Sequence, residues 1–235
     1  FNVTYGGQSV ATTVTGSGLS APYVYKGGTY PGTGGTCATS LAAAGSCDIV
    51  VEFAPTATGL QTDTIDMGYF NGVSTVSVTR DVQGTGLAPA VLTISELDPY
   101  DYTTRPTGSV TQHSFTITNT GAAPATGMAG SGLASPYRFE GSVYPGTTGT
   151  CAVGLGAGAT CTIIVEYAPA AVNGVDTDTI LIDYNDGAVA QQSTRDLTAV
   201  SVAPASLTIS ETDPYNYGTL ATGSSSNNIF VVTNG

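Results

Sequence analysis

Apolar and polar residues alternate along short stretches of this chain, which is the pattern of half-buried β-strands. In "CDIVVEFAP", residues 47–55, alternate positions on one face are Cys47, Ile49, Val51 and Phe53. The stretch at 161–169, "CTIIVEYAP", alternates in the same way. No segment shows three turns of an amphipathic helix. The sequence therefore predicts an all-β protein.

The alternation also predicts which side chains are buried. It places Val51 and Val165 in the core, on the same face as the cysteines. It places Glu52 and Glu166 on the opposite face, toward solvent or a neighbouring chain.

Turn signals separate the predicted strands. "FNG" at 70–72 and "NDG" at 185–187 contain the Asn-Gly and Asp-Gly pairs that favour hairpin turns. Aromatic residues recur with the strands, and we expect most of them in the core. Tyr30 and Tyr144, beside "PG" turns, are the expected exceptions and could bind a carbohydrate.

The chain contains a long internal repeat. "PYVYKGGTYPGTGGTC" aligns with "PYRFEGSVYPGTTGTC" 114 positions later, and after residues 170–173 the offset is 115. At that offset "TDTI", "TRD" and "LTISE" all recur. This period is too long for a solenoid repeat, so each repeat should be a whole domain, most simply a two-sheet sandwich.

Proline-containing segments around 88–90 and 203–205 mark the expected boundaries. Residues 1–87 are predicted to be a domain that lacks its first strands, and residues 88–203 a complete domain. Residues 204–235 are predicted to be the opening strands of a third unit. Both boundary segments are short, so we expect semi-rigid hinges and domains arranged as a rod.

Composition narrows the possible partners. The chain has five Lys and Arg residues and 17 Asp and Glu residues, which gives a formal net charge of −12. This negative charge disfavours binding to nucleic acid and to anionic membranes. No apolar run has the roughly 18–20 residues of a membrane span.

Phe1 is not an initiator methionine, so a preceding segment could have been removed.

Four cysteines form two equally spaced pairs: Cys37 with Cys47, and Cys151 with Cys161. Zinc sites with four cysteines usually contain two close C-x2-C pairs, which this chain lacks. Two local disulfides fit the spacing better, and buried free thiols are the alternative. Disulfides predict an extracellular or cell-surface location.

Little in the sequence favours catalysis. His113 is the only imidazole and its repeat counterpart is Asn228, so nucleophile–base pairs lack a base. Carboxylate pairs such as Asp63/Asp66 and Asp183/Asp186 could serve a glycosidase, but solvated turn residues are the commoner case. We expect no enzymatic activity.

Calcium is the one cofactor for which the sequence contains candidate ligands. "SELDPYDY" groups Glu96, Asp98 and Asp101 after the first boundary, and "SETDPYNY" repeats two of them as Glu211 and Asp213. Oxygen ligands in such a loop could bind Ca²⁺. The alternative is a turn that begins at Asp-Pro, with solvated acids.

The ordered landmarks resemble a known family. "NTG" at 119–121, Cys-x9-Cys, "VEYAP" and "GTGLAPA" together are similar to the Hydin-type, or ASH, immunoglobulin-like repeats of bacterial choice-of-anchor D surface proteins. The resemblance covers essentially the whole chain. It implies immunoglobulin-like β-sandwiches used as a scaffold or stalk, and no catalytic residues. "LTAVSVAPA" departs from the pattern at the second boundary, where the counterparts of Gly84 and Gly86 are missing.

The leading hypothesis is a non-enzymatic structural segment of an extracellular stalk, surface layer or filament. The rival hypothesis is a cell-surface adhesin or glycan-binding module. Expected partners are copies of the chain or adjoining repeats, arranged head-to-tail. The tail at 204–235 carries strands that residues 1–87 lack, so one copy could complete the next. However, "FVVTNG" at the end duplicates "FNVTYG" at the start, and both cannot occupy one strand position, which favours an excerpt of a longer repeat protein.

The cysteine pairs give a direct prediction. The intact mass should be four hydrogens below that of the all-thiol chain, because all four cysteines are expected in disulfides. Mass spectrometry after alkylation without reduction checks this. Alkylation of any of the four cysteines would contradict it.

Overall fold

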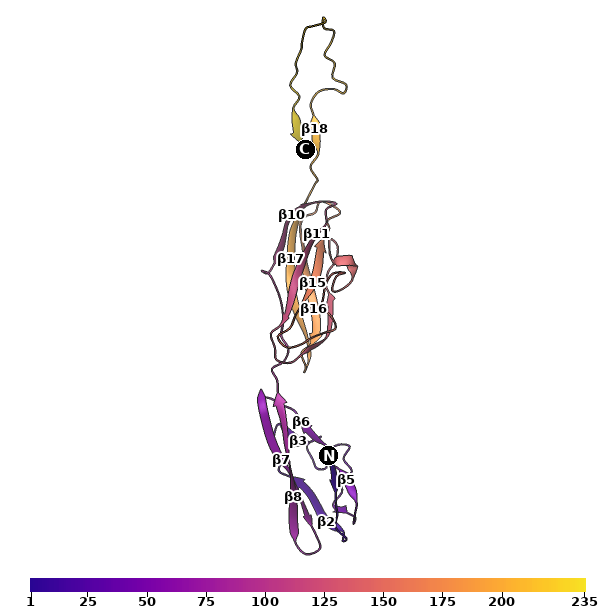
Figure 1. The fold of residues 1–235 in the computed structure, drawn as a ribbon, viewed down its shortest axis with the longest axis vertical. Helices are drawn as coiled ribbons and strands as arrows, with labels where there is room; N and C mark the ends of the chain where they lie inside the picture. The colour runs from indigo at the N-terminus through magenta and orange to yellow at the C-terminus, as the bar shows by residue number, and fades with distance from the viewer. The chain divides into compact units, whose positions relative to one another are not determined.

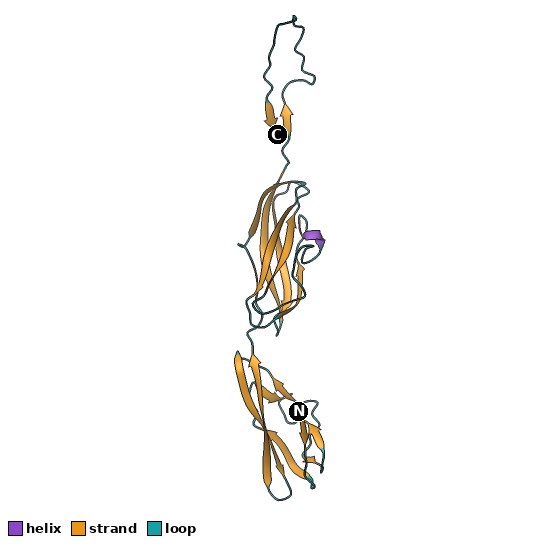
Figure 2. Cartoon of the chain, viewed as in Figure 1, coloured by secondary structure: helices purple, strands orange, loops and turns teal.

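The computed structural model describes residues 1–235 and consists almost wholly of β-strands, with one short 3-10 helix, η1 (Glu140–Ser142). Figures 1 and 2 show the strands and their connecting loops. The all-β prediction is confirmed. The chain divides into two compact units, unit 1 at Phe1–Ala88 and unit 2 at Pro89–Gly235.

Unit 2 contains two facing sheets. One has five strands in the order β10-β17-β16-β12-β14, and the other has four in the order β13-β15-β11-β9. Their bounds are β9 (Leu92–Ile94), β10 (Tyr100–Pro106), β11 (Thr111–Asn119), β12 (Ala125–Ser131), β13 (Tyr137–Phe139), β14 (Gly154–Leu155), β15 (Thr160–Tyr167), β16 (Gly174–Asn185) and β17 (Ala190–Val202).

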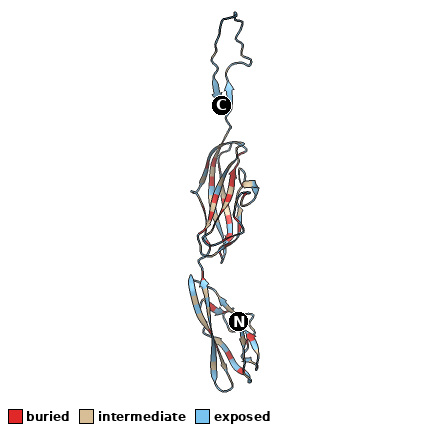
Figure 3. Cartoon of the chain, viewed as in Figure 1, coloured by how far each residue is buried: buried red, intermediate tan, exposed pale blue.

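One hydrophobic core joins the two sheets. It takes Phe115 and Ile117 from β11 and Ile163 from β15, and it takes Ile180 and Ile182 from the opposite sheet. All five residues are completely buried. Figure 3 shows the buried positions along these central strands. Because both sheets bury one face in a shared core, unit 2 is a β-sandwich.

A hairpin turn fixes the register of the five-stranded sheet. β16 and β17 pair antiparallel from Gly174↔Ser201 to Asn185↔Ala190. Between them, the Asp186 carboxylate accepts hydrogen bonds from the backbone amides of Ala188 and Val189. These bonds favour the charged form and lower the pKa of Asp186. The predicted turn at 185–187 is therefore present.

Three tyrosines fill one end of the core of unit 2. The hydroxyl of Tyr102 donates to the carbonyl of Val165, that of Tyr137 to the carbonyl of Asp176, and that of Tyr167 to the Asp176 carboxylate. Burial raises the pKa of all three, and that of Tyr167 to about 12. Buried phenols with satisfied hydroxyls act as large core residues here.

Unit 1 repeats part of this arrangement. A four-stranded sheet has the order β4-β2-β7-β8, and two pairs, β3-β6 and β1-β5, lie apart from it. The bounds are β1 (Asn2–Thr4), β2 (Ala11–Ser17), β3 (Tyr23–Tyr25), β4 (Ser40–Leu41), β5 (Ser46–Asp48), β6 (Val51–Phe53), β7 (Gly59–Phe70) and β8 (Thr75–Gly86). In the repeat, β7 and β8 correspond to β16 and β17, and β1 corresponds to the end of β11. Unit 1 has no counterpart of β9 or β10.

The core of unit 1 is correspondingly smaller. It contains Ala11, Val14, Tyr25, Cys37, Cys47, Ile49, Ile65 and Met67. Phe1 is 59% exposed, whereas its counterpart Phe115 is fully buried. Val51 is only half-buried, whereas its counterpart Val165 is completely buried. These apolar positions are therefore more exposed to solvent in unit 1 than their counterparts are in unit 2, where β9 and β10 are present.

The prediction for Glu166 is wrong. Its side chain is buried, although it lies on the face of β15 opposite to Val165. Arg138 donates to its carboxylate at 2.7 Å from β13, and Gln112 at 2.8 Å from β11. Strands on both sides of β15 thus cover and pair the charge. Glu52 is exposed, as expected, and its neighbour Val24 stands in the place of Arg138.

The last two strands are β18 (Leu207–Ile209) and β19 (Val232–Asn234), which pair antiparallel with each other. Their apolar side chains are exposed, Leu207 by 69% and Ile209 by 65%. Figure 3 shows both strands in the colour of exposed residues.

A core substitution tests the register of β15. Val165→Asp should lower the free energy of unfolding by about 3 kcal/mol or more, because it buries an unpaired charge. Thermal melting measures the effect. Val175→Asp, at a position that is 68% exposed, is the matched control and should change stability little. Equal melting temperatures for the two variants would contradict the register.

The buried tyrosines predict a loss of stability at alkaline pH. Tyr167 ionises near its ordinary pKa of 10.0 in the unfolded chain and at about 12 in the folded one. The unfolded state therefore loses the proton first, so stability is full below about pH 10 and falls as the pH rises toward 12. Urea unfolding between about pH 8 and 11 measures the slope. Tyr167→Phe should flatten it, whereas Tyr217→Phe, at an exposed position, should not.

Candidate functional site

Both predicted disulfides are present, one in each unit. Cys37 is bonded to Cys47 in unit 1, and Cys151 to Cys161 in unit 2. Each bond is buried, and Cys161 faces Ile117 across the β11–β15 pair. The bonds fasten the segment before β5 or β15 to the core. Disulfides of this kind are consistent with an extracellular or secreted protein. No helix of the structure is long and apolar enough to cross a membrane.

The acidic residues after the first boundary lie in separate contacts within unit 2. Glu96 faces His113, with 3.5 Å between its Oε1 and Nε2 of the imidazole. Oδ1 of Asp98 lies 3.7 Å from a guanidinium nitrogen of Arg195 and accepts a hydrogen bond from the backbone amide of Asp196. Oδ1 of Asp101 accepts a hydrogen bond from the backbone amide of Thr103, two residues further along the chain. Glu96 and Asp98 thus hold the β9–β10 connection on β11 and β17, whereas the contact of Asp101 is local to β10.

Glu211 and Asp213, the repeat counterparts of Glu96 and Asp98, are exposed beyond β18, and their carboxylates form no hydrogen bond or ion pair. Nowhere do three His, Cys, Asp or Glu side chains form a group that could hold a metal ion. The structure therefore does not bring the Ca²⁺ candidates together.

His113 lies in an aromatic cluster on β11. Its ring stacks on that of Tyr100, with centroids 4.1 Å apart, and meets the edge of Phe115 at 4.7 Å. No serine or cysteine nucleophile contacts it. The imidazole therefore packs β10 against β11.

Three of the four residues in the carboxylate pairs have their own hydrogen-bond partners, whereas the carboxylate of Asp66 accepts no hydrogen bond. Asp63 accepts from the backbone and side chain of Ser20, which lowers its pKa. Asp183 accepts from Gln192 across the β16–β17 hairpin, while Asp186 closes the turn of that hairpin. These acids hold strands and turns together.

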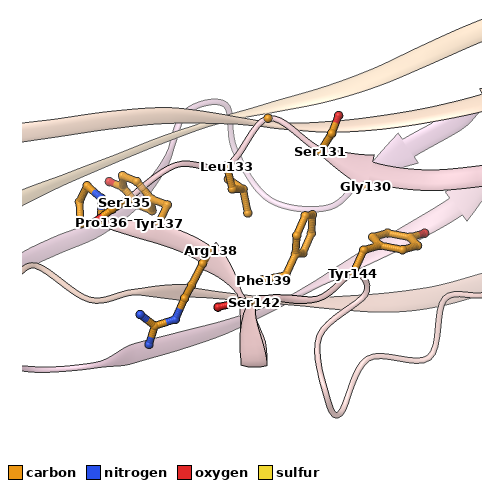
Figure 4. A pocket seen from close by; sticks show the side chains of 11 residues that line it. Gly130, Ser131, Leu133, Ser135, Pro136, Tyr137, Arg138, Phe139, Ser142 and Tyr144 are labelled. Atoms are coloured by element: carbon orange, nitrogen blue, oxygen red, sulfur yellow. The ribbon is translucent and has the colours of Figure 1, made fainter.

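A cleft of about 470 Å³ in unit 2 lies beside the predicted tyrosine site. Figure 4 shows its lining, with the rings of Phe139 and Tyr144, the serines 131, 135 and 142, and Arg138. Tyr144 meets Phe139 edge-on, with centroids 5.6 Å apart, and its buried hydroxyl has no hydrogen-bond partner. The ring is therefore half-buried and packs against Phe139 in the wall of the cleft.

Gly130 makes this packing possible. A Cβ at this position on β12 would overlap the ring of Tyr144 and lie 2.7 Å from Cζ of Phe139. Unit 1 repeats the arrangement with Gly16 beneath Tyr25 and Tyr30.

A second cleft, of about 190 Å³, lies in unit 1 beside β1. Its lining mixes apolar and polar residues and includes Phe1, Val3, Ile49, Met67, Val78 and Arg80. One edge of β1 pairs with β5, and the other pairs with no strand. Arg80 is exposed and has no acceptor within hydrogen-bond or ion-pair distance. We call this feature the β1 cleft.

In unit 2 the strand β9 occupies the corresponding place. It pairs with β11 at Ile94↔Ile117 and Leu92↔Asn119, and it buries Leu92 and Ile94. On its other side, Ser193 donates to the carbonyl of Leu92, and Arg195 donates to that of Ile94 at 2.6 Å. β9 thus bridges the edges of the two sheets.

The role of Arg195 was not among the predictions from the sequence. The repeated "TRD" places Arg80 and Arg195 at the same position of β8 and β17, which was the available signal. Nothing in the sequence showed that the guanidinium reaches the backbone of a strand about a hundred residues earlier.

Comparison with known proteins gives little more. No protein-family model matches the chain, and no curated protein matches it. Among solved structures, the chain resembles the VesB protease of Vibrio cholerae, with 17% identity, 46% of this chain and 31% of that chain covered, and a TM-score of 0.38. A protein of unknown function from Porphyromonas gingivalis has 12% identity, 84% and 87% coverage, and a TM-score of 0.37. Cadherin domains of protocadherin gamma B7 have 10% identity, 95% and 50% coverage, and a TM-score of 0.36. At these TM-scores the similarities carry no argument about function.

The tyrosine cleft gives a stability prediction. Gly130→Ala should push the ring of Tyr144 out of place and lower stability by about 1–3 kcal/mol, because the core there is already filled. Gly156→Ala, whose Cβ would meet nothing within 4 Å, is the matched control. Chemical denaturation compares the two. A Gly130→Ala protein as stable as the control would contradict the described packing.

Proposed function

We propose that this chain is a non-enzymatic structural segment, built of tandem immunoglobulin-like β-sandwich units, from an extracellular stalk, surface layer or filament. The observation that carries the proposal is the repetition itself. Units 1 and 2 place the same disulfide and the same long hairpin at matching positions, and the tail repeats the first strand pair once more.

The strand order of unit 2 supports the immunoglobulin-like class. Across the first sheet, β9, β11, β15 and β13 correspond to strands A, B, E and D of that fold, and in the second sheet β12, β16 and β17 correspond to C, F and G. β10 pairs parallel with β17, as a second half of a split first strand would. This topology agrees with the resemblance to Hydin-type repeats of choice-of-anchor D proteins, which we retain as part of the proposal.

The contacts of the reactive side chains also favour a structural role. Contacts between strands are formed by the imidazole of His113, by the buried carboxylate of Glu166 and by Asp98 in the β9–β10 connection. Groups that hold strands together in this way are typical of a scaffold.

A scattering experiment tests the rod arrangement. A compact globule of this length would have a radius of gyration of about 18 Å. Because the units are expected to follow one another through short hinges, small-angle X-ray scattering at low concentration should give a clearly larger value. A radius near that of a globule would contradict the proposal.

A glycan-binding adhesin is the second candidate, favoured by the cleft that holds serine hydroxyls and Arg138 beside two aromatic rings. Saturable binding on a glycan array that is lost with Tyr144→Ala would support it. Tyr217→Ala, at an exposed position outside the cleft, is the matched control. Absence of binding by the unmodified chain would exclude the glycans tested.

A further inference from the structure

We propose that the tip of the β7–β8 hairpin in unit 1 is a self-modification site, at which Asn71 deamidates through attack by the backbone nitrogen of Gly72. The product at position 71 is aspartate or its isomer isoaspartate, and no enzyme is needed to form it. The inference concerns a turn that the proposed structural role does not use, so it stands apart from that role.

The turn holds the side chain of Asn71 over the backbone that follows it. Oδ1 of Asn71 accepts hydrogen bonds from the backbone amides of Val73 and Ser74, both at 2.9 Å. The backbone amide of Asn71 donates to the carbonyl of Ser74. The side-chain amide is therefore folded back toward Gly72, as in an Asx-turn, and its carbonyl group is fixed in direction. In Figure 1 this turn is the loop that joins β7 to β8.

The backbone nitrogen of Gly72 is free to react. It donates no hydrogen bond, and the residue is exposed to solvent. Gly72 has a φ of +98°, which glycine adopts readily, and it has no side chain that would crowd the attacking nitrogen. Because the nitrogen and the carbonyl carbon belong to neighbouring residues, the turn that positions them contributes directly to the rate.

The reaction balances with water as the only co-reactant. The Gly72 nitrogen gives its proton to solvent and bonds to Cγ of Asn71, and the electron pair of the carbonyl moves onto Oδ1. The amides of Val73 and Ser74 stabilise this charge as an oxyanion hole does. The electron pair then returns, and Nδ2 takes up a proton and leaves as ammonia.

The product of this first step is a cyclic imide, which water opens. Water adds to one of the two carbonyl groups of the ring and breaks the bond from that group to the Gly72 nitrogen. Addition at the side-chain carbonyl gives aspartate, and addition at the main-chain carbonyl gives isoaspartate. The whole reaction consumes one water and releases one ammonia.

Unit 2 has an aspartate at the corresponding position. Asp186 is the repeat counterpart of Asn71, and its Oδ1 accepts hydrogen bonds from the amides of Ala188 and Val189 at 2.8 Å. Its backbone amide donates to the carbonyl of Val189, as that of Asn71 does to Ser74. The same turn thus holds a carboxylate. Aspartate at position 71 would therefore keep these contacts, whereas isoaspartate adds a carbon to the main chain and lengthens the loop.

The glycine amide of unit 2 is not free in this way. Gly187, the counterpart of Gly72, donates to Oδ1 of Asn185 at 2.9 Å. In unit 1, Phe70 stands in the place of Asn185 and has no side-chain acceptor. The tip of unit 1 thus combines a neutral side-chain amide with a free backbone nitrogen, and the tip of unit 2 has neither.

A second Asn-Gly pair, Asn173–Gly174, provides a comparison within the same chain. Nδ2 of Asn173 donates to the carboxylate of Asp176 at 3.1 Å, and no group donates to Oδ1 of Asn173. The carboxylate also opposes the negative charge that attack would place on that oxygen. The two pairs have the same residues, so a difference in their rates reports on the folded structure.

Peptide mapping by mass spectrometry, after incubation of the full chain at neutral and mildly alkaline pH, measures both sites at once. In water enriched in heavy oxygen, each conversion incorporates the label, which separates it from earlier conversion. Asn71 should convert at least about tenfold faster than Asn173, because only Asn71 has donors at the developing oxyanion. Both rates should rise with pH, since the attacking nitrogen must lose its proton.

Unfolding provides the control for local sequence. In concentrated urea the two Asn-Gly pairs should convert at similar rates, because the turn that favours Asn71 is then lost. A preference for Asn71 that persists in urea would show that neighbouring residues, and not the turn, set the rate.

Phe70→Asn tests the role of the free nitrogen. It places in unit 1 the side chain that holds the glycine amide in unit 2, so it should slow conversion at Asn71 about tenfold. Phe70→Leu is the matched control and should leave the rate unchanged. Thermal melting of both variants establishes that unit 1 is folded during the measurement.

Three results would overturn the proposal. They are conversion at Asn71 no faster than at Asn173 in the folded chain, a preference that is the same in urea, and equal rates for folded Phe70→Asn and Phe70→Leu proteins. None of them bears on the proposed structural role, which the scattering experiment tests separately.

Discussion

The complete core of unit 2 depends on one edge strand, β9. Leu92 and Ile94 cover the ends of both sheets, while the strand itself is held by the backbone of β11 and by the side chains of Ser193 and Arg195. A sandwich buries its apolar faces only if its open sides are covered. Phe115 and Val165, next to these strands, are completely buried in unit 2.

The same requirement explains why so few side chains are free for chemistry. His113 stacks between β10 and β11, Glu166 is enclosed by Arg138 and Gln112, and Asp98 joins the β9–β10 connection to β17. Each polar group lies where two neighbouring elements are held together. Buried charges are tolerated there because each has a partner.

Much of this could be predicted from the sequence, because it depends on local pattern. Alternation located the strands, matched spacing located the disulfides, and the Asn-Gly and Asp-Gly pairs located the turns. The burial of Glu166 could not be predicted, since it depends on which residues of β11 and β13 lie beside it across the sheet. The same holds for Tyr144, whose ring packs on its edge because Gly130, on another strand, leaves room for it. Contacts between distant strands follow from register and topology, which the alternation of a single strand does not specify.

The parallel pairing of β10 with β17 has a mechanical consequence for unit 2. These two strands lead toward its opposite chain ends, so tension on the ends pulls them along each other in opposite directions. Their hydrogen bonds are then loaded together, in shear, and do not open one at a time as in an unzipping hairpin. The Cys151–Cys161 bond closes a short loop away from this pair, so it leaves the load on the strands while limiting how far the chain extends once they separate.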